Sequence, residues 1–242
     1  PFDHRDVVVG QGTLGLEIYD ELPEVETVLI GIGGGGLIAG VAAALKARAA
    51  AEGRTVRIIG VQAANSAAYP ASLAAGEPLE VATTPTIADG IAVARPGNVP
   101  FEIIRELVDD VVTVTDDDIA RAILMLLERA KLVVEPAGAV GVAALLSGKV
   151  QATGPVVSVL SGGNIDPLLL QRVVAHGLAE AQRAGAVARR ERERRVRVRE
   201  ADGVVTHDAA HERLHPQRLQ RPVAADDDGA RARDDPAGLH AG

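Results

Sequence analysis

A run of four glycines between two apolar segments constrains this chain more than any other feature of its sequence. Residues 27–32 (TVLIGI) are apolar and short, which is typical of a strand buried on both faces. Residues 37–51 are rich in alanine and leucine, which favour a helix. The sequence therefore predicts a buried strand, a glycine loop and a helix that follows at once, as in the sheets of α/β proteins.

Alternation of the same kind runs along most of the chain. We predict strands where short apolar runs occur, at residues 6–9, 27–32, 56–61, 110–114 and 155–160. We predict helices at residues 13–21, 37–51, 66–75, 116–130, 136–146 and 167–184. Thr115 and Asp118 have the spacing of a capping box at the start of one of these helices. The predicted fold class is α/β, an open doubly wound parallel sheet that binds ligands beyond the carboxyl ends of its strands.

The composition changes near residue 187. Residues 1–186 are aliphatic and contain most of the glycines, and the whole chain has only two Phe, two Tyr and no Trp, so the core must consist of Val, Ile, Leu and Ala. We predict that residues 1–186 are one α/β domain. Residues 187–242 are rich in Arg, Ala, Asp and Pro and have too few apolar residues to bury a core. We predict an irregular or disordered Arg-rich tail there, and one hypothesis for its composition is a frameshift near Ala188.

Charge and composition exclude several classes of function. A net charge of −8 disfavours a nucleic-acid partner, which needs a basic surface. The absence of cysteine excludes disulfides, thiolate metal sites and thiol nucleophiles. No apolar run approaches the roughly 18 residues of a membrane span, and the first residues, PFDHRD, do not resemble a secretory signal. We therefore expect a cytoplasmic protein with no membrane partner, whose sequence begins inside a longer chain because it lacks an initiator Met.

The glycine loop has three interpretations: a flexible turn, a dinucleotide-binding fingerprint, or a cup for the phosphate of a smaller cofactor. Gly31, Gly33 and Gly36 satisfy the fingerprint G-x-G-x-x-G, but Gln62 stands where an acidic residue should close the next strand. Four glycines are costly to order, and their amides can surround an anion together with the start of the following helix. These observations favour the phosphate cup.

Five motifs in order resemble those of one enzyme family. GIGGGGLIAG at residues 31–40 resembles the tetraglycine loop of the fold-type II pyridoxal-phosphate enzymes. Its companions are PFDHRDVVVGQGTLGLEI at 1–18, TIADGIAV at 86–93, KLVVEPAGAVGVAALL at 131–146 and VVSVLSGGNID at 156–166. Over residues 1–184 the chain resembles the threonine/serine dehydratase (threonine ammonia-lyase) family. The resemblance implies the C-terminal part of such an enzyme, with an incomplete tryptophan-synthase-β-like fold.

The resemblance also implies a site for pyridoxal 5'-phosphate. The matching positions for its phosphate are Gly33, Gly34, Gly35, Gly36 and Leu37. The hydroxyl of Ser161 would bond the pyridine nitrogen, which suits β-elimination because a hydroxyl does not force the ring to be protonated. The alternative is an ordinary turn with Ser161 bonded to the backbone. Asp89 and Gly90 would lie near the cofactor. Glu135 has two interpretations: the resemblance implies a position near the active site, but an acidic residue before a proline is also typical of a helix start. Some relatives bind a divalent cation through an acidic residue at the position of Gln62, so we predict no metal site here.

The residues that carry out the family's chemistry are absent from this sequence. The Schiff-base lysine in its S-x-K context and the S-x-G-N-H motif that binds the substrate carboxylate do not occur, and we interpret Lys46, Lys131 and Lys149 as solvated surface residues. We therefore assign no catalytic residue in this chain. The resemblance implies that the intact enzyme is a homo-oligomer and converts L-threonine or L-serine to 2-oxobutyrate or pyruvate plus ammonia. Alternatives are a serine racemase, a nicotinamide- or flavin-binding domain, and a non-catalytic protein that binds the phosphate cofactor.

Overall fold

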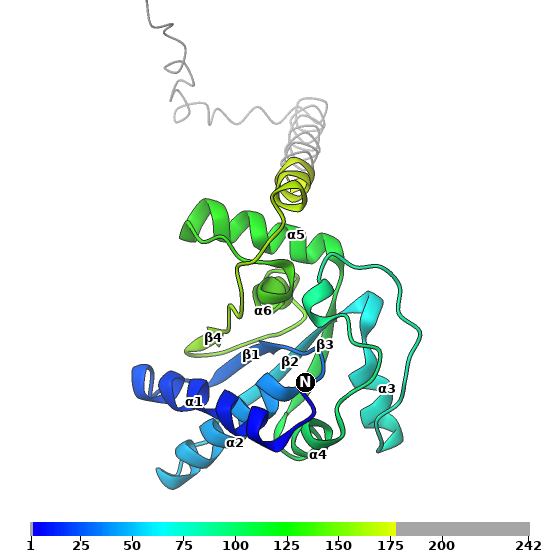
Figure 1. The fold of residues 1–242 in the computed structure, drawn as a ribbon. Coiled ribbons are helices and arrows are strands. Elements are labelled where there is room, and N and C mark those ends of the chain that lie inside the picture. The colour runs from blue at the N-terminus through cyan, green and yellow to red at the C-terminus, as the bar shows by residue number, and fades with distance from the viewer. Residues whose placement is uncertain (1, 178–242) are drawn as a thin grey trace, which may run out of the picture. The chain divides into compact units, whose positions relative to one another are not determined.

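The strands of this chain form a parallel sheet, as their apolar composition predicted. The computed structural model describes residues 2–177. Within them the strands are β1 (Thr27–Gly31), β2 (Arg57–Ala63), β3 (Asp110–Val114) and β4 (Val156–Ser158). They lie in the order β3-β2-β1-β4, and all neighbours run parallel (Figure 1). Val28 of β1 is paired with Ile58 of β2 and with Val157 of β4, so β1 is central.

Helices cover both faces of the sheet. They are α1 (Arg5–Glu21), α2 (Gly36–Ala51), α3 (Ala68–Ala75), α4 (Asn98–Leu107), α5 (Asp116–Met125) and α6 (Pro136–Leu146), with the short turns η1 (Ala64–Ser66), η2 (Asp89–Ile91) and η3 (Leu126–Ala130). Residues 167–177 are helical as well. Figure 1 shows α1, α2 and α4 on one face and α5 and α6 on the other. This is the doubly wound arrangement that the sequence predicted.

Alternation along the central strand divides the core into two layers. Val28 and Ile30 of β1 pack in the same cluster as Ile104 of α4. Leu29, between them, packs in the other cluster with Val140 of α6. Successive side chains of a strand point to opposite faces, so this one strand supplies both layers. Aliphatic side chains make up most of both clusters, but the cluster that contains Val28 also includes the buried rings of Tyr19, Tyr69 and Phe101, so the prediction of a core without aromatic residues is wrong there.

The prediction of a strand at residues 6–9 is wrong. These residues lie in the first turns of α1, where the amide of Asp6 donates a hydrogen bond to Nδ1 of His4 at 3.2 Å. Three successive valines favour a strand by propensity. However, Val8 is buried while Val9 is 74% exposed, which is the one-sided burial of a surface helix. Packing of α1 against α2 overrides the local preference.

The helix α4 is absent from the sequence-based prediction. Its N-cap residue, Gly97, has no side chain to cap the helix. Instead, the carboxylate of Asp3 accepts hydrogen bonds from the amide of Val99 at 2.8 Å and from the side chain of Asn98 at 3.0 Å. The hydrogen bond from the Val99 amide, with those from Asn98, lowers the pKa of Asp3 below its ordinary value. Because this cap comes from a residue remote in sequence, no local signal marks the start of α4.

The helix at 116–130 begins as predicted but ends in an irregular turn. The amide of Asp118 donates to Oγ1 of Thr115 at 3.2 Å, and the amide of Thr115 donates to Oδ2 of Asp118 at 3.0 Å, which confirms the capping box. The α-helix ends at Met125, and a π-turn continues to Ala130. Lys131 then adopts a φ of 60°, which closes the turn.

Part of the sequence-based prediction lies outside the described residues. This applies to residues 178–184 of the last helix, to the Arg-rich tail at 187–242 and to the domain boundary between residues 186 and 187. Among residues 2–177, no helix is both long enough and apolar enough to cross a membrane.

Candidate functional site

The glycine loop joins the end of β1 to the first turn of α2. Gly35 is the N-cap of α2 and has a φ of 102°, a left-handed conformation that glycine adopts without strain. Gly34, Gly35 and Gly36 are buried. Within residues 2–177, no acceptor is bonded to six successive amide N–H groups, those of Gly33, Gly34, Gly35, Gly36, Leu37 and Ile38. Buried donors need an acceptor, and the positive end of the α2 dipole favours an anionic one.

Close neighbours leave no room for side chains on this loop. A Cβ atom at Gly34 would overlap the ring of Phe2, and one at Gly35 would overlap the hydroxyl of Tyr69. A Cβ atom at Gly33 would lie 3.2 Å from Cα of Ile91. The loop therefore presents only backbone groups. Such a surface fits a phosphate, which proteins commonly bind through N–H groups at the start of a helix.

Side chains behind the loop hold its carbonyl groups. The carbonyl of Gly34 accepts a hydrogen bond from the hydroxyl of Tyr69 at 3.0 Å and another from the amide of Gly97 at 3.0 Å. The amide group of Gln62 donates to the carbonyl of Ile32 at 3.3 Å and accepts from the amide of Tyr69 at 2.9 Å. Gln62 is fully buried and both ends of its side chain are bonded, so it is not available to a ribose as the dinucleotide interpretation requires.

The ADG motif and the start of α6 lie against the same edge of the sheet. Gly90 follows Asp89 in η2 and is exposed. A Cβ atom at Gly90 would lie 3.0 Å from Cβ of Ala137 and 3.7 Å from Oε1 of Glu135. Since η2 also contacts the glycine loop at Ile91, the structure brings three separate motifs together.

Glu135 connects the start of α6 to the SGGN turn. The amide of Glu135 donates to the carbonyl of Gly162 at 3.0 Å, and its carboxylate accepts from the amide of Asn164 at 3.2 Å. A Cβ atom at Gly162 would overlap this carboxylate. Glu135 therefore holds the turn in place, which is a structural task that the sequence did not indicate.

Ser161 opens the SGGN turn and is exposed. Its hydroxyl makes no hydrogen bond with any residue in the range 2–177. The turn that the sequence allowed as an alternative, with Ser161 bonded to the backbone, is therefore not the one that the structure contains. The hydroxyl is free to bond a ligand at the carboxyl end of β4.

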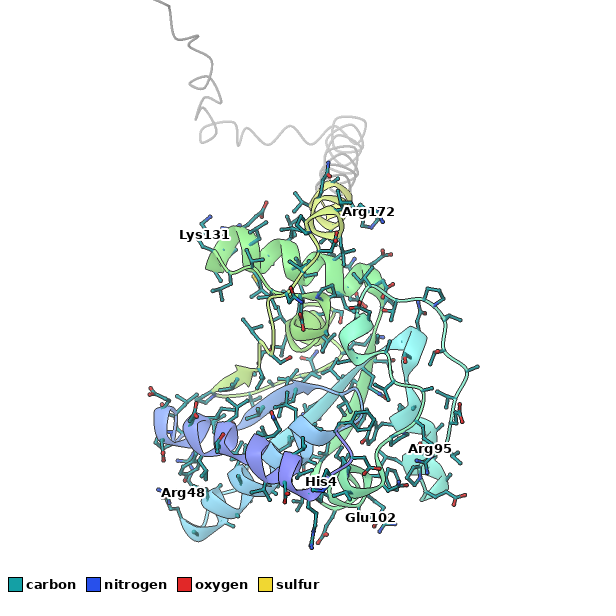
Figure 2. The ribbon with its side chains drawn as sticks, viewed as in Figure 1. His4, Arg48, Arg95, Glu102, Lys131 and Arg172 are labelled. Carbon is teal, nitrogen blue, oxygen red and sulfur yellow. The ribbon has the colours of Figure 1, made fainter. Side chains whose placement is uncertain are left out.

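The three lysines lie away from the glycine loop. The sequence-based interpretation of all three as solvated surface residues does not fit Lys46. Lys131 follows the π-turn η3, which continues α5, and its exposed side chain is labelled in Figure 2. Its Nζ donates to the carbonyl of Glu128 at 2.7 Å. Lys149 is exposed. Lys46 is not simply solvated, because its side chain is only 25% exposed and its Nζ lies 2.8 Å from Oδ2 of Asp109. The ion pair joins α2 to the start of β3.

Two residues of this region were not indicated by their sequence patterns. Tyr69 contacts the glycine loop from α3, and Asp3 caps α4 next to Gly97, which itself bonds the loop. Tyr69 belongs to none of the motifs found in the sequence, and Asp3 lies in the motif at residues 1–18, which does not indicate its contact with α4. Within the described residues, no group of three or more His, Asp or Glu side chains is placed to hold a metal ion.

Known proteins share this arrangement of motifs. The model of a family described as "Pyridoxal-phosphate dependent enzyme" matches residues 1–162. Over 184 residues the chain is 52% identical to an L-threonine ammonia-lyase of Geobacter sulfurreducens and 48% identical to one of Thermotoga maritima; each match covers 76% of this chain and 45% of the relative. Over 169 residues it is 49% identical to the catabolic L-threonine dehydratase TdcB of Escherichia coli K12, covering 69% of this chain and 50% of the relative. The chain spans about half the length of these relatives.

Solved structures agree with the sequence comparisons. The crystal structure of a T.th. threonine deaminase superposes with a TM-score of 0.64 at 38% identity, covering 69% of this chain and 61% of that one. The structure of maize serine racemase superposes with a TM-score of 0.62 at 35% identity, covering 72% of this chain and 54% of that one. The fold of this chain is thus shared with proteins of both descriptions.

Proposed function

We propose a function from one premise, that this chain belongs to the family of pyridoxal-phosphate-dependent enzymes. In the proposal, the chain is the C-terminal part of an L-threonine/L-serine ammonia-lyase and supplies the site for the cofactor phosphate. The observation that carries the proposal is the run of amide N–H groups at residues 33–38 that have no acceptor within the described part of the chain. The identity to L-threonine ammonia-lyases supports the choice of reaction.

The glycine loop would hold the phosphate. The proposed ligands are the backbone N–H groups of Gly33, Gly34, Gly35, Gly36 and Leu37. A phosphate near them would satisfy donors that burial otherwise leaves unpaired, and it would also be stabilised by the α2 dipole. No carboxylate of the described residues is bonded to the loop's amides, so no like charge competes for them.

Ser161 and Gly90 would lie beside the cofactor ring. Pyridoxal phosphate, when bound, supplies an electron-withdrawing ring that stabilises negative charge at the α-carbon of an amino acid. The hydroxyl of Ser161 would bond the ring nitrogen as a neutral partner. Gly90 would let the backbone of η2 approach, and Glu135 would keep the SGGN turn at a fixed position through its bonds to Gly162 and Asn164.

The proposed reaction is a β-elimination followed by hydrolysis. The α-proton and the β-hydroxyl of L-threonine leave as water, which gives an enamine. The enamine tautomerises to an imine, and addition of water to the imine releases 2-oxobutyrate and ammonia. We place the lysine that bonds the cofactor outside this chain. The lysines here are bonded to Asp109, bonded to the backbone of Glu128, or exposed at a helix end, and none adjoins the glycine loop.

A serine racemase is the second candidate function. The likeness to maize serine racemase, at 35% identity, is close to the likeness to the threonine deaminase, at 38%. Both reactions begin with removal of an α-proton and so require the same cofactor site. The product formed from L-serine therefore separates the two functions.

The test uses the complete protein that contains this chain, loaded with pyridoxal phosphate. We expect L-threonine to yield 2-oxobutyrate, and we expect Ser161→Ala to lower turnover by about threefold to tenfold, the value of one lost hydrogen bond between neutral groups. The matched control is Ser147→Ala. Ser147 lies at the far end of α6, about 18 Å along the helix from Glu135 at 1.5 Å per residue, and its hydroxyl bonds backbone carbonyls of α6.

Each outcome points to one function. Release of 2-oxobutyrate that depends on Ser161 and not on Ser147 supports the ammonia-lyase. Formation of D-serine from L-serine without any keto acid would replace it with the racemase. Tight binding of pyridoxal phosphate without either reaction would leave a non-catalytic cofactor-binding protein.

A further inference from the structure

We propose that Tyr69 is a positioning residue, whose hydroxyl sets the orientation of the peptide groups in the glycine loop so that they can bind a phosphate. The inference rests on the proposed function of that loop. Tyr69 is fully buried at the start of α3, and its hydroxyl donates to the carbonyl of Gly34 at 3.0 Å. Nothing in its sequence context marks it as part of the site.

Because a peptide group is rigid, the hydrogen bond from Tyr69 to the carbonyl of Gly34 also sets the direction of the N–H of Gly35. A trans peptide group is planar, and its N–H points opposite to its C=O. The carbonyl of Gly34 is bonded to Tyr69 and to the amide of Gly97, so both of its lone pairs are used. The N–H of Gly35, in the same peptide group, must therefore point away from Tyr69 and Gly97. Gly35 has no side chain and a φ of 102°, so without these bonds its peptide could rotate more freely.

Gln62 exerts the same control on the peptide group two residues earlier, between Ile32 and Gly33. Its side-chain amide donates to the carbonyl of Ile32 at 3.3 Å, which directs the N–H of Gly33 away from Gln62. The other end of the Gln62 side chain accepts from the amide of Tyr69 at 2.9 Å and so fixes the start of α3. One buried pair of side chains thus orients the peptide groups before Gly33 and before Gly35.

The hydroxyl of Tyr69 is what distinguishes it from a phenylalanine at this buried position. The ring packs with Phe101 at a centroid distance of 6.3 Å, and a phenylalanine would fill that space equally well. A buried hydroxyl is unfavourable unless it is bonded, and within residues 2–177 the partner of this one is the carbonyl of Gly34 in the loop. Burial also raises the pKa of Tyr69, with a smaller contribution from the charge of Asp3. Both Tyr69 and Gln62 are therefore neutral supports, which place no negative charge behind a loop that binds an anion.

The experiment compares two substitutions that each remove one tyrosine hydroxyl. Tyr69→Phe removes the bond to the loop. Tyr19→Phe is the matched control, because Tyr19 is also buried and its hydroxyl bonds Glu52 at 2.8 Å, away from the loop. Binding of pyridoxal 5'-phosphate, of pyridoxal without its phosphate and of inorganic phosphate is measured for each variant. The ³¹P resonance of the bound phosphate reports its surroundings.

We expect Tyr69→Phe to weaken binding of pyridoxal 5'-phosphate and of inorganic phosphate by about threefold to tenfold, the value of one hydrogen bond. Its affinity for pyridoxal should not change, the ³¹P resonance should shift, and Tyr19→Phe should behave as the wild type. If the variant were partly unfolded, affinities for all three ligands would fall together, so the ratio of affinities for the phosphorylated and unphosphorylated forms still reports the loop.

Two failures are distinguishable. If the wild type prefers pyridoxal 5'-phosphate over pyridoxal and Tyr69→Phe shows the same preference with an unshifted ³¹P resonance, Tyr69 has no positioning role. If the wild type has no such preference and does not bind inorganic phosphate, the proposed function of the loop is wrong, and the inference is wrong with it.

Discussion

The contact between α1 and α2 offers a stability test in which one substitution serves as the control for another. The two helices pack closely because glycines face each other across them. A Cβ atom at Gly40 of α2 would overlap the carbonyl oxygen of Val8 and lie 2.8 Å from the amide nitrogen of Gly12, both in α1. By contrast, a Cβ atom at Gly10 of α1 would meet nothing within 4 Å. Gly40→Ala and Gly10→Ala therefore add the same methyl group in opposite surroundings.

The two changes should alter the free energy of unfolding in opposite directions. Replacing Gly by Ala inside a helix contributes about 0.5–1 kcal/mol of stability where there is space. Gly10→Ala should therefore be stabilising by about that amount. At Gly40 the obstructing atoms belong to the backbone of α1, so the helices must separate to admit the methyl group. Overpacking of this kind costs about 1–3 kcal/mol, and after the gain in helix propensity is subtracted it leaves a net loss of up to about 2.5 kcal/mol.

Urea unfolding followed by far-ultraviolet circular dichroism measures both changes. For a chain of this size a difference of 1 kcal/mol corresponds to about 2–4 °C in the melting temperature, so thermal scans provide a second measurement. The reasoning would be refuted if Gly40→Ala were as stable as Gly10→Ala. Equal stability would mean that α1 and α2 do not approach as closely as the glycine contacts indicate.

Three further outcomes follow from individual contacts. Asp3→Ala should lower the free energy of unfolding by about 1 kcal/mol at pH 7, because it removes the cap of α4. Folding lowers the pKa of Asp3, so the wild type should lose this advantage as the pH falls below about 4. Urea unfolding of both proteins at pH 7 and at pH 2.5 measures the difference. Thr115→Ala should cost about 1 kcal/mol in the same assay by breaking the capping box, whatever the ligand state. Substitution of Lys46, Lys131 or Lys149 by Met, one at a time, should leave the affinity for pyridoxal 5'-phosphate unchanged, and a large loss for any of them would contradict the placement of the cofactor's lysine outside this chain.

Elements with local signals could be predicted from the sequence. The strand β3 and the helix α6 have the predicted bounds, because an apolar run and a proline at the first helical turn are local features. The segment at residues 6–9 was predicted incorrectly because three valines favour a strand by themselves, whereas burial of one side of α1 depends on α2. The helix α4 was not predicted although residues 98–107 are amphipathic, and the cap that fixes its start, Asp3, lies far away in the sequence.

Some residues of the candidate site could also be predicted from the sequence, and others could not. The motifs around Gly33, Gly90 and Ser161 are visible in the sequence, and the structure brings them to one edge of the sheet. The supports behind them are not visible, because Tyr69 and Glu135 act through hydrogen bonds to segments far along the chain. A sequence pattern can indicate which backbone groups meet a ligand, but it does not indicate which side chains hold those groups in place.

The central claim is that the glycine loop binds the phosphate of pyridoxal 5'-phosphate, and a crystal structure with this cofactor bound tests it most directly. We expect phosphate oxygens within about 2.7–3.2 Å of the backbone nitrogens of several residues from Gly33 to Leu37, which is ordinary hydrogen-bond distance. We also expect the carbonyl of Gly34 to keep its bond to Tyr69. A cofactor phosphate bound elsewhere, with these nitrogens facing only solvent or protein, would contradict the account.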